Sequence, residues 1–322
     1  KNTIIGAYAG YQSLLPDNCT LVGYNAAGGG VMTAAADGTV AVGFSALAAL
    51  TTGIGNVSVG YQCLDAEATG DYSTAVGHQA LSAQTGVDGA VGNTAIGFQS
   101  GMAITLGRFS TAIGASALRT EDVGDRTVAI GFESLYSQNS DSNNETTGNT
   151  GIGYASGYYN VTGQNNTYLG YQSGKGASGQ SNSNNVGVGS NALLDITDGQ
   201  RNTAIGQSAG ANLTTAHRTV MIGDSAGVGV MITNSGGSVP SYADGSVGIG
   251  YSALGALTTG AGNVAVGYQA GDALTTESNN TILGHTAGSA LTSANNTLIG
   301  SLCATTVTTG SNNTAVGYGA LN

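Results

Sequence analysis

Short apolar stretches recur along the chain, each preceded by a small polar residue and followed by glycine. Examples are "NTAIGFQSG" at 93–101, "NTAIGQSAG" at 202–210 and "NVAVGYQAG" at 263–271. Aligned on the central glycine, which we call position zero, the motif occurs 18 times, and 11 of the 17 intervals between these glycines are 17 residues long. A fixed short period predicts a repeat architecture in which each motif forms one stacked unit. The central glycines are Gly6, Gly23, Gly43, Gly60, Gly77, Gly97, Gly114, Gly131, Gly153, Gly170, Gly189, Gly206, Gly223, Gly250, Gly267, Gly284, Gly300 and Gly317.

The apolar positions of the motif alternate as in a β-strand. Position −1 is Val, Ile or Leu in all 18 copies, and position −3 is Thr or Val in all 18. Side chains two residues apart lie on one face of a strand, and we expect this face to be buried inside the repeat unit. Position −2, on the opposite face, never carries a charge. A strand without charge on either face is covered on both, so we expect a second layer of protein against position −2.

Further columns of the alignment constrain the turns. The invariant glycine at position zero predicts a bend or a close approach of two backbones. Asn fills position −4 in 11 copies, which favours a ladder of stacked side-chain amides. Position +1 is Tyr or Phe in ten copies and His in two more, His78 and His285. This column is either a stacked aromatic ladder or an exposed strip for binding sugars, and its full length favours the ladder.

These patterns predict an all-β fold, a repetitive parallel β-solenoid with 18 coils of about 17 residues that forms a single repetitive shaft over residues 1–322. The longer intervals predict insertions near 28–38, 82–92, 136–148, 176–184 and 228–246, which we expect to protrude as loops on one outward side.

The longest insertion, near 228–246, carries apolar and aromatic side chains that a free loop does not need. It is the best sequence candidate for contact with a partner or glycan, through Met231, Ile232, Asn234 and Tyr242. An insertion without a ligand is the simpler alternative.

Charge and composition narrow the possible functions. The formal net charge of −11 argues against nucleic acid as a partner, and no apolar run is long enough to insert into a membrane. Of the 18 acidic residues, 16 lie outside positions −5 to +4, which we interpret as solvated turns, and no catalytic carboxylate pair stands out. Cys19, Cys63 and Cys303 have no metal-ligand spacing, so we expect unpaired thiols, no metal and no cofactor.

Two stretches match the G-x-S-x-G spacing of a hydrolase nucleophile: "GQSAG" at 206–210 and "GDSAG" at 223–227. Ser208 and Ser225 both occupy position +2, where "GHTAG" at 284–288 has Thr and "GYQAG" at 267–271 has Gln. The spacing is therefore a by-product of the repeat. We expect neither serine to be catalytic and the chain not to be an enzyme.

The motif [Asn/Ser]-[Thr/Val]-Ala-[Ile/Val]-Gly-x-x-Ala resembles the head repeats of YadA-like trimeric autotransporter adhesins. It is also similar to the "NTAIGYQAL…TTG" arrays of bacteriophage tail fibres. The resemblance implies that each repeat is one coil of a left-handed parallel β-roll and that three chains pack into a homotrimer, which would supply the second layer against position −2. The repeat of 17 residues is longer than that of the adhesin heads, which implies a longer turn in each coil.

The resemblance implies an extracellular structural protein, most simply the shaft of a phage tail fibre that presents a receptor-binding tip. The expected partners are two further copies of the chain and a cell-surface glycan or protein receptor. A bacterial surface adhesin is the main alternative. A glycan-depolymerising tailspike and an ice-binding solenoid are weaker ones, the latter because seven of the 18 copies have Val in the Thr column.

Overall fold

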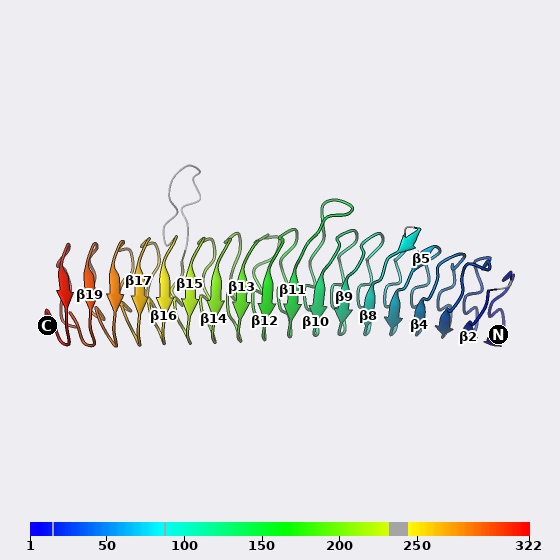
Figure 1. Ribbon diagram of the computed structural model, residues 1–322, viewed down its shortest axis with the longest axis horizontal. Helices are drawn as coiled ribbons and strands as arrows, with labels where there is room; N and C mark the ends of the chain where they lie inside the picture. The colour runs from blue at the N-terminus through cyan, green and yellow to red at the C-terminus, as the bar shows by residue number, and fades with distance from the viewer. Residues whose placement is uncertain (15, 87, 232–243) are drawn as a thin grey trace. The chain divides into compact units, whose positions relative to one another are not determined.

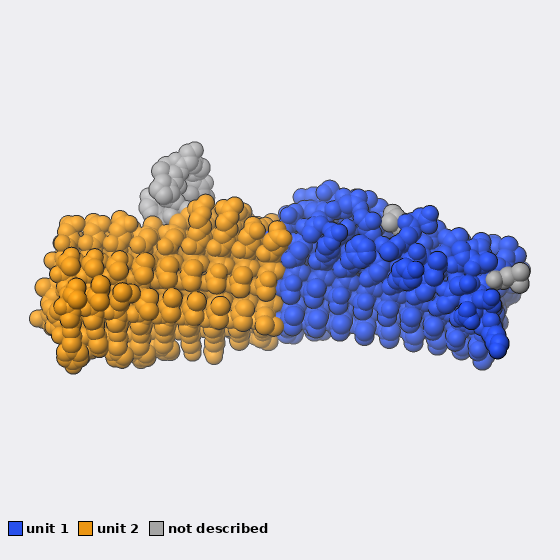
Figure 2. All heavy atoms as spheres, in the orientation of Figure 1, with its two compact units in different colours: residues 1–164 blue, residues 165–322 orange. Residues whose placement is uncertain are grey.

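The computed structural model describes residues 1–14, 16–86, 88–231 and 244–322. The described residues form strands and turns with no helix, and they confirm an all-β parallel β-solenoid with one coil for each of the eighteen motifs. Contacts divide the chain into two units, residues 1–164 and residues 165–322, coloured separately in Figure 2. Each unit is a solenoid of nine coils and is described by itself.

Each coil contributes one strand of three residues, at positions −3 to −1 of the motif (Figure 1). In unit 1 these strands are β1 (Thr3–Ile5), β2 (Thr20–Val22), β3 (Val40–Val42), β4 (Val57–Val59), β6 (Thr74–Val76), β8 (Thr94–Ile96), β9 (Thr111–Ile113), β10 (Val128–Ile130) and β11 (Thr150–Ile152). In unit 2 they are β12 (Thr167–Leu169), β13 (Val186–Val188), β14 (Thr203–Ile205), β15 (Val220–Ile222), β16 (Val247–Ile249), β17 (Val264–Val266), β18 (Thr281–Leu283), β19 (Thr297–Ile299) and β20 (Thr314–Val316).

Neighbouring strands of a unit pair in parallel with equal motif positions opposite each other. In β9 and β10, for example, Thr111 pairs with Val128 and Ile113 pairs with Ile130. Each residue therefore stacks on its counterpart in the next coil, so one column of the sequence alignment becomes one column of side chains in space.

The central glycine is required by both its backbone angle and its surroundings. Its φ lies between 129° and 147° in all eighteen coils, a region that L side chains rarely adopt. A Cβ added to Gly114 would lie 2.4 Å from the carbonyl oxygen of Gly131 in the next coil. The predicted close backbone approach is confirmed, and it recurs from coil to coil within both units.

The two faces of the strand are the reverse of the sequence expectation. Position −2 points into the coil and is buried, as at Ala75 and Ala112, whereas positions −3 and −1 face outward and are partly exposed, as at Thr111 and Ile113. The expectation that −3 and −1 line the coil interior was wrong. The interior takes Ala, Gly or Ser at −2 in 12 of the 18 copies, and the β-branched residues lie outside, where they still favour a strand.

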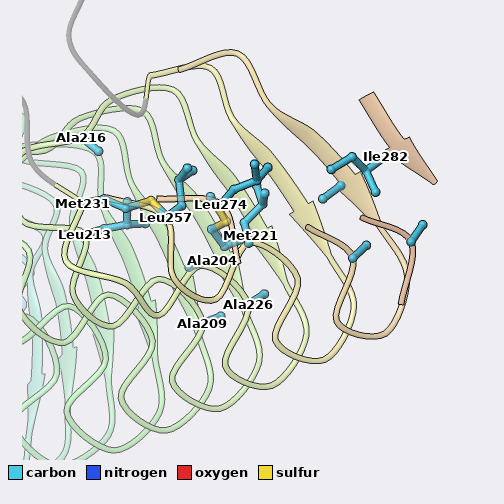
Figure 3. Close-up of a cluster of buried hydrophobic side chains, with 14 of the residues drawn as sticks. Ala204, Ala209, Leu213, Ala216, Met221, Ala226, Met231, Leu257, Leu274 and Ile282 are labelled. Atoms are coloured by element: carbon cyan, nitrogen blue, oxygen red, sulfur yellow. The ribbon is translucent and has the colours of Figure 1, made fainter. Parts of the chain in front are cut away.

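Side chains of different sizes compensate one another inside the coil. Met221 occupies position −2 of its coil, and the residue at +4 is Gly227, where a Cβ would lie 2.4 Å from the Met221 sulfur. Gly248 occupies position −2 of the following coil, and Leu254 fills the space at +4. Figure 3 shows the core around Met221, with leucines such as Leu257 at position +7 completing it. In these two coils, the choice of Gly or Leu at +4 matches the volume of the side chain at −2.

A buried asparagine ladder runs beside the core, as the sequence predicts. The Asn202 Oδ1 accepts a hydrogen bond from the backbone N–H of Thr219 in the next coil, with a donor–acceptor distance of 3.0 Å. Its Nδ2 donates to the Ala216 carbonyl at 2.8 Å. The same pair of bonds recurs at Asn56, Asn93 and Asn185. Each asparagine therefore satisfies backbone groups of the following coil, which stabilises the stack.

The insertions are more integrated than free loops. In unit 1, Gly89–Ala90 forms a short strand, β7, that pairs in parallel with β5 (Gly70–Asp71). Met32 lies in the core within the insertion near 28–38, and Val91 is buried within that near 82–92. Only the insertion near 136–148 protrudes clearly among the described insertions of unit 1, between β10 and β11 (Figure 1).

Replacing Gly114 by Ala should destabilise unit 1 by about 3 kcal/mol or more, because the substitution adds backbone strain and a clash with the Gly131 carbonyl. Gly38→Ala is the matched control. Gly38 also has a positive φ, 72°, but no atom lies within 4 Å of its added Cβ, so this variant should lose only about 1 kcal/mol. Urea unfolding measures both losses. Equal losses in the two variants would contradict the close approach.

Candidate interaction surface

An uncharged sheet face of Thr, Val, Ile and Leu residues covers one side of each unit. We call the side chains at positions −3 and −1 of the strands the outer sheet face. Within the described strands it contains only Thr, Val, Ile and Leu, and no charged side chain. Several of its residues are strongly exposed: Ile96 by 40%, Leu169 by 45% and Ile205 by 39%.

An aromatic ladder lies at position +1, two residues after the last strand residue at position −1. In unit 1 the rings of Tyr24, Phe44, Tyr61, His78 and Phe98 stack in sequence, with centroids 5.0 to 5.4 Å apart. The interplanar angles are between 11° and 29°. In unit 2 a shorter ladder joins Tyr251, Tyr268 and His285. The predicted ladder is confirmed.

The ladder geometry bears on what this column can bind. Each inner ring has a neighbouring ring against both faces, and Tyr61 and Phe44 are nevertheless 45% and 44% exposed. The exposed parts are therefore ring edges. A sugar packs its C–H groups against an aromatic face, so the stacked rings do not offer the platform that the sugar-binding interpretation requires. Ring edges pack well against apolar side chains of another protein surface.

The serines of the two G-x-S-x-G stretches lie in turns of the coil. Ser208 and Ser225 have φ values of 52° and 55°, as do other residues at position +2, such as Gln99 with 52°. The Ser225 hydroxyl donates to Asp224 Oδ1 at 2.7 Å.

The two histidines of unit 2 contact residues other than these serines. His217 Nδ1 accepts a hydrogen bond from the backbone N–H of Gln200 at 2.8 Å. His285 Nδ1 lies 3.4 Å from the hydroxyl of Thr286, and its ring stacks on Tyr268. Neither contact involves a serine of a G-x-S-x-G stretch.

The predicted contact loop is only partly described. Met231 is fully buried and belongs to the core of unit 2 (Figure 3). It forms a parallel bridge with Leu213 of the preceding coil, so the expectation that it lies on a contact surface was wrong. The sequence predicts that Met231 lies in an insertion, whereas its side chain fills part of the core of unit 2. Ile232, Asn234 and Tyr242 lie outside the described residues.

The interpretation of all turn acids as solvated was also wrong. Glu67 and Glu121 are fully buried, and Asp125 is 2% exposed. Asp125 Oδ1 accepts a hydrogen bond from the backbone N–H of Arg108 one coil earlier, at 2.8 Å. Alignment of position +7 would have revealed the two glutamates, because Leu or Ile occupies that position in coils such as those of Leu50 and Leu257. A polar residue in such a column signals a buried polar site.

The thiols are structural. Cys19, Cys63 and Cys303 are free and buried, as expected. Burial raises the pKa of all three thiols, which keeps them protonated and poorly nucleophilic. Among the described residues, no group of three His, Cys, Asp or Glu side chains is placed to hold a metal ion.

Helices of a length and apolarity suited to crossing a bilayer do not occur in the described part of the chain. The outer sheet face and the aromatic ladder together are the candidate functional surface. Comparison with known proteins finds no family model and no curated protein that matches this chain.

Proposed function

We propose that this chain is the shaft of an extracellular fibre and that its copies associate side by side as a homotrimer through the outer sheet face. The observation that carries the proposal is the exposed, uncharged sheet face, repeated on every coil. The chain has a formal net charge of −11, yet the two columns of the outer sheet face carry no charge. Such a surface is suited to a partner that is also uncharged where it makes contact. A second copy of the same chain presents such a surface.

The size of the face supports association over the whole length. Nine strands about 4.8 Å apart give each unit a strip roughly 40 Å long, and at a width of roughly 10 Å its area is on the order of 400 Å². The two units of one chain together provide on the order of 800 Å², which a trimer divides between two neighbours, so each interface receives on the order of 400 Å² from a chain, about half of the contribution in a standard stable interface. The aromatic edges at position +1 would enlarge this contact.

The proposed trimer packs through a different face of the strand from the one that the sequence predicts. Position −2, expected to face the shared interior of the trimer, instead lies inside its own coil, as Ala112 does with 1% exposure. The second layer therefore has to contact positions −3 and −1. An aspartate at Ala112 would disrupt the coil itself and would not report on assembly.

Within this proposal the shaft has no catalytic role. It holds a receptor-binding part of the fibre away from the particle or cell that carries it, and the resemblance of the motif to phage tail-fibre arrays favours a virion. A bacterial surface adhesin is the second candidate, favoured by the resemblance to YadA-like head repeats. In both cases the receptor is a surface glycan or protein.

Two aspartates on the outer sheet face should break the trimer without unfolding the chain. In Thr111→Asp/Ile113→Asp both side chains point outward and are partly exposed, so the coil tolerates them. Three chains would bring six carboxylates together at the shared interface, and we expect association at least about a hundred-fold weaker. Sedimentation equilibrium measures the mass, and circular dichroism checks the fold.

Ser142→Asp/Asn143→Asp is the matched control, because it adds the same charge to exposed residues of the insertion near 136–148. It should remain trimeric. A wild-type chain that is monomeric at micromolar concentration would refute the proposal, and so would a trimer that survives the pair of aspartates at 111 and 113.

Neither serine of the G-x-S-x-G stretches should react as a nucleophile. A fluorophosphonate probe should label neither Ser208 nor Ser225, and alanine at either position should change the free energy of unfolding by less than about 0.5 kcal/mol. Mass spectrometry of the labelled chain measures the first result, with a known serine hydrolase as positive control. Stoichiometric labelling of Ser225 would show that the chain is an enzyme.

A further inference from the structure

Two carboxylates of unit 1 are buried at a position where other coils place a leucine or isoleucine. Glu67 and Glu121 both occupy position +7 of their coils and have no exposed surface. In unit 2 the same position holds the buried Leu257, Leu274 and Leu291. A buried carboxylate is costly unless hydrogen bonds satisfy it, so its repeated use calls for an explanation.

The Glu67 carboxylate is held by backbone and side-chain N–H groups. Its Oε1 accepts from the N–H of Thr69 at 3.0 Å and of Gly70 at 2.7 Å. Its Oε2 accepts from Nε2 of Gln84, the residue at +7 of the next coil, at 2.7 Å. Gln84 is itself fully buried, and its Oε1 accepts from Asn93 Nδ2 at 2.9 Å.

The Glu121 carboxylate has the same arrangement three coils later. Its Oε1 accepts from the N–H of Gly124 at 2.8 Å. Its Oε2 accepts from Gln138 Nε2, again at +7 of the next coil, at 2.9 Å. Asn149 Nδ2 donates to Gln138 Oε1 at 2.9 Å. Ser140, two residues further along, donates its hydroxyl to Glu121 Oε2 at 3.1 Å.

No basic side chain takes part in either network. The ion pairs among the described residues join the N-terminus to Asp17, Arg108 to Asp125 and Arg218 to Asp244. Each glutamate is therefore balanced by uncharged N–H and O–H donors, and of these the glutamine amide, together with Ser140 at Glu121, comes from the next coil. Such networks add specificity of structure more than stability, because leaving any donor unpaired is costly.

Both networks lie where an insertion begins. Gln84 and Gln138 are in the coils with the intervals of 20 and 22 residues that carry the insertions near 82–92 and 136–148. A Cβ on Gly86, within the first insertion, would lie 2.4 Å from Glu67 Oε1, so the chain passes directly over the carboxylate. Ser140 makes the corresponding contact in the second insertion.

We infer that the Glu67–Gln84 and Glu121–Gln138 pairs are register locks, which specify the neighbouring coil for each insertion-bearing coil and fix the base of the insertion. Nearly identical repeats can pair with the wrong neighbour at little loss of apolar contact, because most columns match in any register. If the coil after Glu67 were looped out, Ile104 would replace Gln84 at position +7, and Glu67 would lose the Gln84 amide that its carboxylate requires.

The test replaces one lock with the leucine pair of unit 2. Glu67→Leu/Gln84→Leu reproduces Leu257 and Leu274, and it leaves the second lock intact. Register is read by engineered cysteines on the outer sheet face. Val57 and Thr74 are paired in β4 and β6, so cysteines at 57 and 74 report the native register, whereas cysteines at 57 and 94 report a register shifted by one coil.

After refolding and mild oxidation, the chain with both locks should form the 57–74 cross-link and not the 57–94 cross-link. In the double-leucine background the 57–94 cross-link should appear. Amide exchange of Gly89 and Ala90 in β7 should also be about ten-fold faster, while exchange in β9 and β10 stays unchanged. Leu257→Met/Leu274→Met, an apolar change in unit 2, is the control and should keep the native exchange of β7.

Three outcomes would overturn the inference. A double-leucine variant with only the native cross-link and unchanged exchange would show that the leucine pair specifies register equally well. A variant that unfolds instead of shifting would assign the network to stability alone. The 57–94 cross-link in a chain with both locks intact would show that the locks do not select the register.

Discussion

The contact between the central glycine of one coil and the glycine carbonyl of the next determines the rest of this structure. An atom added to Gly60 would lie 2.3 Å from the carbonyl oxygen of Gly77, so no side chain fits between them. Because this contact recurs from coil to coil within each unit, neighbouring coils remain at strand spacing along the whole turn. In and around each strand, from position −4 to position +2, a residue then has a fixed neighbour, namely the residue at the same motif position one coil away.

This rule makes like side chains stack, and the chain uses the stacking in different ways. Asparagines at −4 satisfy the next coil's backbone, aromatic rings at +1 pack face to face, and glutamines at +2 donate to one another, as Gln99 does to Gln79 at 3.0 Å. Each such bond or ring pair contributes on the order of 1 kcal/mol. Where stacking would overfill the interior, as at Met221, the neighbouring positions are reduced to glycine.

The sequence was sufficient to predict features that depend on one column at a time. The number of coils, the glycine contact, the asparagine ladder and the aromatic ladder all follow from that kind of reasoning. Single columns did not predict which face of the strand points into the coil. Neither face carries a charge, and only the volume inside the coil decides between them. Ala112 shows the difficulty: a small residue fits a crowded trimer axis and a narrow coil interior equally well.

Glu67 and Met231 escaped prediction for a related reason. Acidic residues in turns are usually solvated, whereas the position of Glu67 is occupied in other coils by a buried Leu or Ile, such as Leu50 and Ile104. The long interval around Met231 predicts an insertion, whereas Met231 continues the coil beside Leu213. In both cases the structural role was set by the residue one coil away, which local sequence does not reveal.

The outer sheet face is free of charge in every coil. Packing inside the coil does not explain this, because positions −3 and −1 point away from the interior. Strand propensity favours β-branched residues there, but exposed strands also accept polar and charged side chains. A restriction that holds in all eighteen copies, across both units, therefore points to something outside the coil that acts along the full length of the chain.

A receptor would restrict only the few coils that it contacts. Lateral packing against further copies of the same chain would restrict every coil equally, and this uniformity favours a shaft over a local binding site.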